Sequence, residues 1–246
     1  MTEPSPSFPV PVKDHPHFRI CIRPEIFKPD LIPTLRDCFE IIERTKVSLR
    51  GWDYPHVSHE TQEKGYGNNW VASWSSFCSL EYWRFFQSGQ FVHYLGIREK
   101  IDSDWETELR STLKRHLSYM KNLDFSKISG LFSVSGAVYT ITEIFEFAIR
   151  LCQKGLYSNN LVIEIALNNV QGFALVADRN RAWHHLYQAS EPSFSKEWKI
   201  PVSELIASGH DFSIEVVIWL FERFGWFDPP REILKKDQEK FLSGQY

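Results

Sequence analysis

The chain has 246 residues and a formal net charge of −3, with 43% hydrophobic and 24% charged residues. This composition is ordinary for a soluble globular protein, and the length allows one large domain or two small ones. The acidic balance argues against a protein whose main partner is a nucleic-acid backbone. The aromatic share of 15% is high and is typical of thick cores, stacking sites and interfaces.

The cysteines and the apolar runs indicate in which cellular compartment the protein is expected. Cys21, Cys38, Cys78 and Cys152 lie far apart and form no CxxC pair, which indicates small buried side chains in a reducing compartment. The first residues lack the basic and apolar regions of a signal peptide, and the longest apolar run, 216–221, is too short to span a bilayer. We therefore expect a cytoplasmic protein with no membrane partner.

Proline content divides the chain into a short lead-in and a body. Residues 1–16 contain five prolines and predict an extended segment, whereas residues 17–246 are expected to form one globular body. Within the body, 17–125 and 126–246 predict strands, helices and a hairpin in a similar order. No residue-level repeat accompanies this similarity, so a duplication is a hypothesis that the sequence leaves open.

The first part of the body alternates strands and one helix. Residues 17–23 alternate apolar and polar side chains, the pattern of a half-buried strand. A cap at Asp30 predicts a helix over 31–45, and a strand over 46–54 completes a unit of βαβ size. A polar loop then precedes a strand over 70–77.

Two aromatic runs predict an antiparallel hairpin over 82–87 and 90–95, with its turn at Ser88-Gly89. If Phe86 pairs with Phe91, Arg84 lies opposite His93 on one face. Because that face is otherwise mostly apolar, we expect this pair at an exposed rim or on the floor of a polar pocket.

The remaining elements lead to the fold class. The predicted helices cover about 103–121, the segment from a capping box at Thr140 to a stop at Gly155, 212–224 and 231–242. The predicted strands cover 128–135, 161–167, 172–176 and 183–188, and those over 161–167 and 172–176 are expected to form a hairpin. Together they predict an α/β or α+β protein with a mixed, largely antiparallel sheet and packed helices.

The segment RGWDYPH, which begins at Arg50, supplies most of the candidate site. We expect Arg50, Trp52 and Asp53 to form one recognition surface with Arg84 and His93. Fixed cations, an aromatic face and a titratable imidazole suit a small anionic or planar ligand.

Two alternatives to a recognition surface remain open. Asp53 can orient His56 as an acid–base pair, which predicts a small hydrolase-like enzyme. Alternatively, Asp53 and Trp52 only complete a structural turn. The chain has no nucleophile elbow and no glycine-rich nucleotide-binding motif, and its His and Cys residues have no metal-ligand spacing. We therefore expect neither a metal nor a cofactor.

The sequences LRGWDYPH (49–56) and YWRFFQSGQFVHY (82–94) together resemble a poorly characterised prokaryotic module that is sometimes joined to Schlafen-type AlbA-like domains. The resemblance covers residues 17–97 and carries over no catalytic residue. It implies an accessory module with a sensing or partner-binding role in prokaryotic regulation or defence. The leading functional expectation is thus non-catalytic recognition of a protein partner, a second copy of the chain, or a small ligand.

Overall fold

The computed structural model describes residues 10–76, 80–98, 103–120 and 124–245. Within these residues, a seven-stranded antiparallel sheet forms the centre of the fold. The strand order is β2-β3-β4-β5-β1-β7-β9, and a separate small sheet pairs β6 with β8 in parallel. The prediction of an α/β or α+β protein with a largely antiparallel sheet is confirmed, and the structure is of the α+β class. The strands are β1 (His17–Pro24), β2 (Lys64–Tyr66), β3 (Trp70–Ser75), β4 (Glu81–Phe86), β5 (Phe91–Gly96), β6 (Gly130–Ser133), β7 (Asn160–Asn168), β8 (Phe173–Val176) and β9 (Ser193–Pro201).

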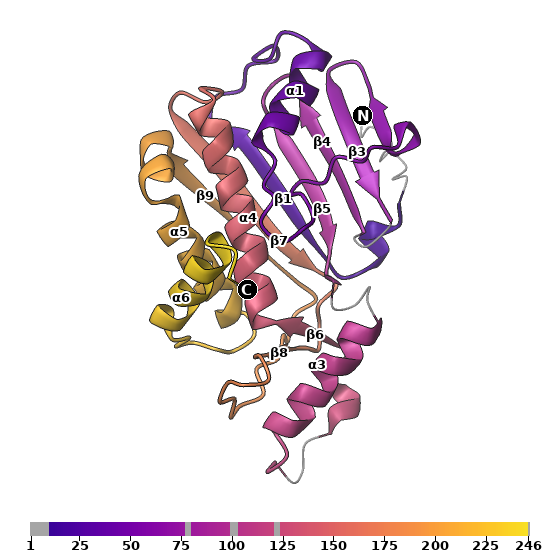
Figure 1. Ribbon diagram of the computed structural model, residues 1–246, viewed down its shortest axis with the longest axis vertical. Helices are drawn as coiled ribbons and strands as arrows, with labels where there is room; N and C mark the ends of the chain where they lie inside the picture. Colours follow the sequence, from indigo (N-terminus) through magenta and orange to yellow (C-terminus); the bar gives the residue numbers. More distant parts are fainter. Residues whose placement is uncertain (1–9, 77–79, 99–102, 121–123, 246) are drawn as a thin grey trace.

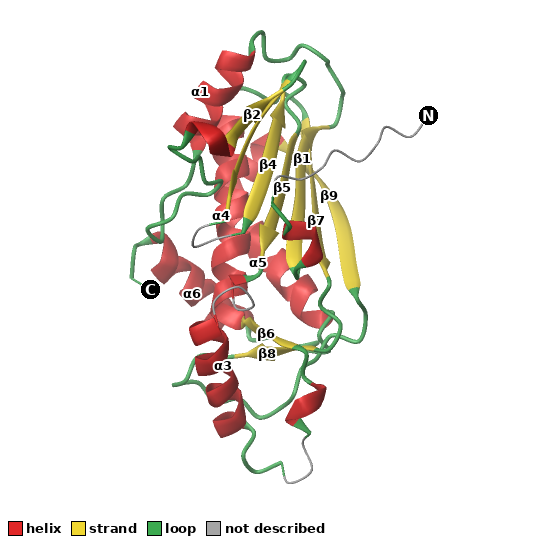
Figure 2. Ribbon diagram, turned by 90° about the vertical axis from the view of Figure 1, so that its right-hand side faces the viewer, coloured by secondary structure: helices red, strands yellow, loops and turns green. Residues whose placement is uncertain are grey.

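The long helices lie on one side of the large sheet (Figure 2). Helices α4 and α5 pack together, α1 contacts β3 and α4, and α6 packs on α4 and α5. Helix α3 lies beyond the end of the large sheet, next to β6 and β8 (Figure 1). The helices are α1 (Leu35–Thr45), α3 (Ser103–His116), α4 (Val134–Gln153), α5 (Val202–Glu222) and α6 (Arg231–Leu242).

Helix α4 is the most deeply buried helix of the layer. Fourteen of its twenty residues are buried, on almost every side, as expected for a helix enclosed by other elements. Ser133 caps its first turn, because the Ser133 hydroxyl accepts a hydrogen bond from the Gly136 amide at 3.1 Å. The predicted capping box at Thr140 is therefore wrong. The strand predicted over 128–135 is present as β6, which ends at Ser133. Val134 and Ser135 already belong to the helix, since tertiary burial overrides their local preference.

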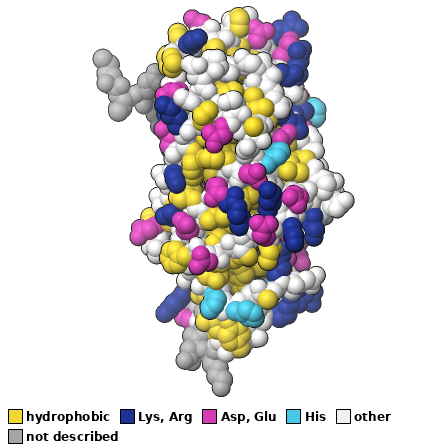
Figure 3. Space-filling model, turned by 90° about the vertical axis from the view of Figure 1, so that its left-hand side faces the viewer, with side chains coloured by type: hydrophobic (Ala, Val, Ile, Leu, Met, Phe, Trp, Pro, Cys, Tyr) yellow, Lys and Arg dark blue, Asp and Glu magenta, His cyan; other side chains and the backbone are white. Residues whose placement is uncertain are grey.

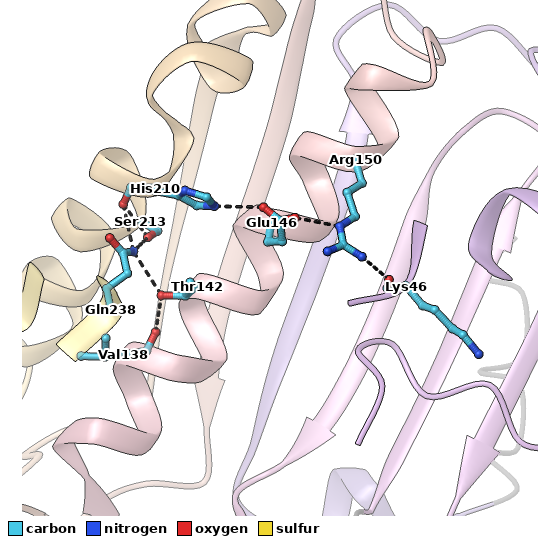
Figure 4. A network of polar contacts seen from close by, with 8 residues as sticks. All are labelled: Lys46, Val138, Thr142, Glu146, Arg150, His210, Ser213 and Gln238. Carbon is cyan, nitrogen blue, oxygen red and sulfur yellow. Dashed lines mark hydrogen bonds and ion pairs between the residues drawn. The ribbon is translucent and has the colours of Figure 1, made fainter. Parts of the chain in front are cut away.

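A polar network ties α4 to the two helices beside it (Figure 4). The Gln238 side-chain amide of α6 donates to the Thr142 hydroxyl at 3.1 Å, the His210 carbonyl at 3.0 Å and the Ser213 hydroxyl at 2.6 Å. One turn further along α4, Glu146 lies 2.9 Å from the His210 ring. The buried Thr142, Ser213 and Gln238 side chains thereby find partners inside the helix layer, as buried polar groups normally do.

The start of the described chain covers part of the other face of the sheet. Val10 and Val12 are buried against Ala72 and Tyr82, and residues 12–14 form a short 3-10 helix, η1 (Val12–Asp14). Residues 10–16 are therefore folded onto the sheet, and the prediction of an extended lead-in is wrong for them. Residues 1–9 lie outside the described residues.

The aromatic hairpin is confirmed, but its register differs from the prediction by one residue. Phe85 pairs with Phe91 and Trp83 pairs with His93. The Phe86 amide bonds to the Gln90 carbonyl at 2.9 Å, which closes a three-residue loop ending at Gly89, whose φ is +77°. This loop is one residue shorter than the one assumed, and a one-residue slip moves every side chain of one strand to the other face.

Other predicted elements divide into those that are present and those that are not. The strand over 17–23 and the helix over 231–242 are present, whereas α1 is capped by Thr34 rather than Asp30. Residues 46–54 form a loop closed by one bridge between Val47 and Tyr54, so the βαβ unit is wrong.

The second predicted hairpin is also wrong, because its two strands belong to different sheets. The strand over 161–167 lies within β7, which pairs with β1 and β9, whereas β8 pairs with β6. Residues 183–188 contribute only a bridge at Gln188. Since β1 lies between β5 and β7, strands from both predicted halves form one sheet.

Charges of both signs alternate with apolar side chains on the side of the molecule that carries α5 and α6 (Figure 3). The exposed apolar side chains of this region include Ile206, Phe227 and Ile233, which belong to three different segments. Single exposed apolar side chains of this kind are ordinary on protein surfaces.

The Gln238 network predicts a measurable stability cost when its donor is removed. Gln238→Leu leaves the buried Thr142 and Ser213 hydroxyls without this donor, so we expect a loss of about 1–3 kcal/mol in the free energy of unfolding. Urea denaturation measures the loss. Gln153→Leu, at an exposed end of α4, is the control and should cost less than about 0.5 kcal/mol. Equal stability of the two variants would contradict a structural role for the network.

Candidate functional site

A cavity of about 500 Å³ opens where the loop of residues 48–53, the start of α4 and the ends of β4 and β5 meet. Its volume is in the range of small-molecule sites. Aromatic and apolar side chains form much of its wall, and a small number of charged groups reach into it. The aromatic lining residues are Phe18, Trp52, Tyr54, Trp105, Phe132 and Tyr139.

Glu81 holds the loop against the sheet. One carboxylate oxygen accepts from the Trp52 indole N–H at 2.9 Å, and the other lies 3.0 Å from His93 Nε2 and 3.4 Å from the His56 amide. In return, the Trp83 indole donates to the His56 carbonyl at 2.6 Å. The loop is thus fixed from below by buried side chains of the hairpin.

Arg50 joins the same loop to α4. Its guanidinium donates to Glu143 at 2.7 Å and to the Thr140 hydroxyl at 3.1 Å. The Arg50 side chain is partly exposed, whereas the Glu143 carboxylate is buried. The ion pair therefore forms part of the cavity wall and orients the Glu143 carboxylate toward the loop.

The two buried carboxyls of the site differ in acidity. Burial raises the pKa of Glu143 to about 7, and the opposing attraction of Arg50 does not cancel this effect. Burial also raises the pKa of Glu81, but the hydrogen bond and charge of His93, together with the Trp52 indole, outweigh it, so that the Glu81 pKa lies below its usual value. Glu81 is therefore ionised at neutral pH, while Glu143 exchanges its proton near neutrality.

Two buried polar atoms on the cavity wall have no hydrogen-bond partner among the described residues. They are Oε1 of Glu143 and the hydroxyl oxygen of Tyr54. Burial, followed by the charges of Glu143 and Glu81, raises the Tyr54 pKa well above its usual value. Since buried polar groups are normally paired, these atoms mark a place where a ligand group can bind.

Some of the groups that line the cavity favour an anion. Ser133, Ser135 and Gly136, at the N-terminus of the 20-residue helix α4, belong to the lining. The Gly136 amide is bonded to the Ser133 hydroxyl, and the Ser135 hydroxyl donates to the Asp178 carboxylate at 2.9 Å. The positive end of a helix dipole and its first amides attract negative charge. The exposed side chain of Arg98 lies at the same cavity and adds a cation.

Three of the five residues expected to form the recognition surface come together. Arg50, Trp52 and Asp53 all line the cavity. His93 is fully buried beneath them, where it contacts Glu81 and the ring of Tyr54. Arg84 lies on the opposite face of the sheet, so the prediction that it shares a face with His93 is wrong because of the hairpin register.

On that opposite face, Arg84 belongs to an aromatic cluster. Its guanidinium lies 4.2 Å from the centre of the Trp70 ring and hydrogen-bonds the Tyr82 hydroxyl. The inner face of the hairpin, with Trp83, Phe85 and His93, is fully buried. The hairpin therefore contributes its inner side chains to the core and not to an exposed binding patch.

The acid–base pair of the alternative enzyme hypothesis is not formed. Asp53 accepts from Ser48 and forms an ion pair with Lys46 at 3.0 Å, and no hydrogen bond joins it to His56. His56 instead stacks on Trp52, with 3.9 Å between the ring centres. Burial lowers the pKa of His56 despite the nearby charges of Glu81 and Asp53.

Glu81 and Glu143 are the principal site residues that the sequence reasoning missed. A signal for both is present in the sequence. Glu81 occupies the same face of its strand as Trp83 and Phe85, and Glu143 stands within an apolar helical run. An acidic residue at a core-facing position needs a buried partner, and such residues often mark functional sites.

Within the described residues, no group of three or more His, Cys, Asp or Glu side chains is arranged to hold a metal ion. None of the helices in this part of the chain combines the length and the apolar character needed to cross a membrane. Comparison with models of protein families, with curated proteins and with solved structures finds no match to this chain. The resemblance to the Schlafen-associated module therefore stays a prediction.

The position of Arg84 predicts a structural effect without an effect on the cavity. Arg84→Ala removes the cation from the Trp70 ring and the donor from the Tyr82 hydroxyl, and we expect a stability loss of about 0.5–2 kcal/mol. Thermal and urea unfolding measure it, with Arg36→Ala as the control on the exposed side of α1. If Arg84→Ala had unchanged stability but bound a ligand more weakly, Arg84 would belong to the binding surface and the structural role would be contradicted.

Glu143 predicts a pH-dependent stability. Its pKa is about 7 in the folded protein against 4.5 in the unfolded chain, so the folded state binds the extra proton. The resulting stabilisation is complete below the unfolded value and is lost as the pH rises through about 7. Between about pH 5 and about pH 8, wild type should lose on the order of 2 kcal/mol relative to Glu143→Gln. Denaturant titrations of both proteins across this range measure the difference, and parallel profiles would contradict the assignment.

Proposed function

We propose that this protein is a non-catalytic recognition module that binds a small planar ligand with an anionic group in the cavity beside the N-terminus of α4. The observation that carries the proposal is the joining of aromatic walls, formed by Trp52 and Trp105 among others, with Arg98 and the start of a long helix. Aromatic side chains stack on planar groups, and helix N-termini bind anions.

The rigidity of the site supports binding without large rearrangement. The loop is held by Glu81 from the sheet and by Glu143 from α4, so the Trp52 ring and the Arg50 guanidinium are positioned before a ligand arrives. A preorganised wall reduces the entropy that binding costs. A sensing role in prokaryotic regulation, as the resemblance implies, is part of this proposal.

Arg98 provides the direct test. A panel of planar anions, comprising AMP, CMP, UMP, indole-3-carboxylate and benzoate, is screened by thermal shift and followed by isothermal titration calorimetry. We expect at least one member to raise the melting temperature of wild type. Arg98→Glu should weaken its binding about tenfold, because a favourable charge at the cavity becomes repulsive.

Arg36→Glu is the matched control, since it makes the same charge change at a side chain that does not line the cavity. It should bind the ligand as wild type does. The proposal is overturned if no planar anion binds, or if the two arginine variants weaken binding equally.

A further inference from the structure

The hydrogen-bonding groups of the cavity indicate which chemical groups the ligand carries, in addition to its being planar and anionic. Glu143 Oε2 is occupied by Arg50 at 2.7 Å, whereas Oε1 faces no donor among the described residues. The Glu143 residue is only 1% exposed, so this oxygen is not compensated by open solvent. A buried carboxylate oxygen of this kind needs an N–H or O–H donor.

Tyr54 limits the identity of that donor. Its hydroxyl also has no partner among the described residues, and Tyr54 lines the same cavity as Glu143. A phenol can donate or accept one hydrogen bond while the carboxylate accepts another. An amino group beside a ring nitrogen on a flat heterocycle matches this pair, because the amino group donates to Glu143 and the ring nitrogen accepts from Tyr54.

The remaining parts of the cavity suit the rest of such a molecule. The aromatic rings of Trp52 and Tyr139 also line the cavity, and aromatic rings can stack on a heterocycle. Arg98 and the N-terminus of α4 line the cavity as well, and a cation beside a helix N-terminus suits a phosphate. The volume of about 500 Å³ is sufficient for one mononucleotide-sized molecule.

We infer that the cavity binds a free nucleotide whose base carries an exocyclic amino group, with that amino group on Glu143 Oε1 and the phosphate at the start of α4. This inference rests on the proposed function and adds the chemical class of the ligand.

The test compares ligands that differ mainly at the amino position. AMP is compared with purine riboside 5′-monophosphate, and CMP with UMP, by isothermal titration calorimetry on the full chain. In at least one pair we expect wild type to bind the amino-bearing nucleotide about tenfold or more tightly, as a buried acceptor left without a donor costs this much. In Glu143→Gln the preference should fall to about twofold or less, because the amide presents a competing donor.

Glu146→Gln is the matched control, being the same substitution on the same helix outside the cavity wall, and it should keep the full preference. If Glu143→Gln does not fold, Tyr54→Phe tests the neighbouring ring-nitrogen contact instead. It should weaken the binding of AMP or CMP severalfold, and unchanged binding of both would overturn the inference. A short adenine-containing single-stranded oligonucleotide separates the sources of the base: tighter binding than AMP would replace the free nucleotide by a nucleic-acid strand and overturn the inference.

The outcomes separate the two proposals. Equal binding within both ligand pairs by wild type, or an unchanged preference in Glu143→Gln, overturns the amino-nucleotide inference. The recognition function survives that result if another planar anion binds in an Arg98-dependent manner. If no planar anion binds at all, both proposals fail.

Discussion

The burial of α4 on almost every side is the constraint on which the rest of the structure depends. A buried polar group on such a helix has no water to bond, so it needs a partner. The buried Thr142 hydroxyl accepts from Gln238 of α6, and the half-buried Glu146 carboxylate pairs with His210 of α5. These contacts connect segments that are far apart in the sequence and give the helix layer one arrangement.

The same constraint builds the site at the other end of the helix. Thr140 and Glu143 both bond Arg50, and this brings a loop from the first part of the chain onto a helix from the second. From the sheet, Glu81 fixes the same loop by accepting a hydrogen bond from the Trp52 indole. The loop therefore rests on two buried carboxyls, one from each layer. Glu143 differs from the other buried polar groups of α4 because one of its oxygens remains without a partner among the described residues.

Opposite behaviour of the two carboxyls follows from their surroundings. Glu81 is surrounded by donors, so its charge is stabilised despite burial, whereas Glu143 has mainly Arg50 to oppose the cost of burial. A site that contains one permanently charged and one titratable carboxyl can hold its own structure with the first and interact with a ligand through the second.

Local patterns in the sequence determined a substantial part of the architecture. Strict alternation predicts β1, aromatic runs around Ser88-Gly89 predict the β4–β5 hairpin, and the charged stretch at the end predicts α6, because each depends only on neighbours along the chain. The same reasoning singled out the loop that begins at Arg50, whose residues line the cavity.

Tertiary structure alone decided the register of the hairpin and the partners of the buried carboxyls. A three-residue loop instead of a four-residue loop places Arg84 and His93 on opposite faces, and the sequence of the turn is compatible with either length. Likewise, Glu143 and Arg50 meet only because α4 packs across the sheet, and no local pattern specifies that contact. Much of the secondary structure follows from short-range preferences. A binding site, in contrast, requires distances between remote segments, and those distances are set only when the core packs.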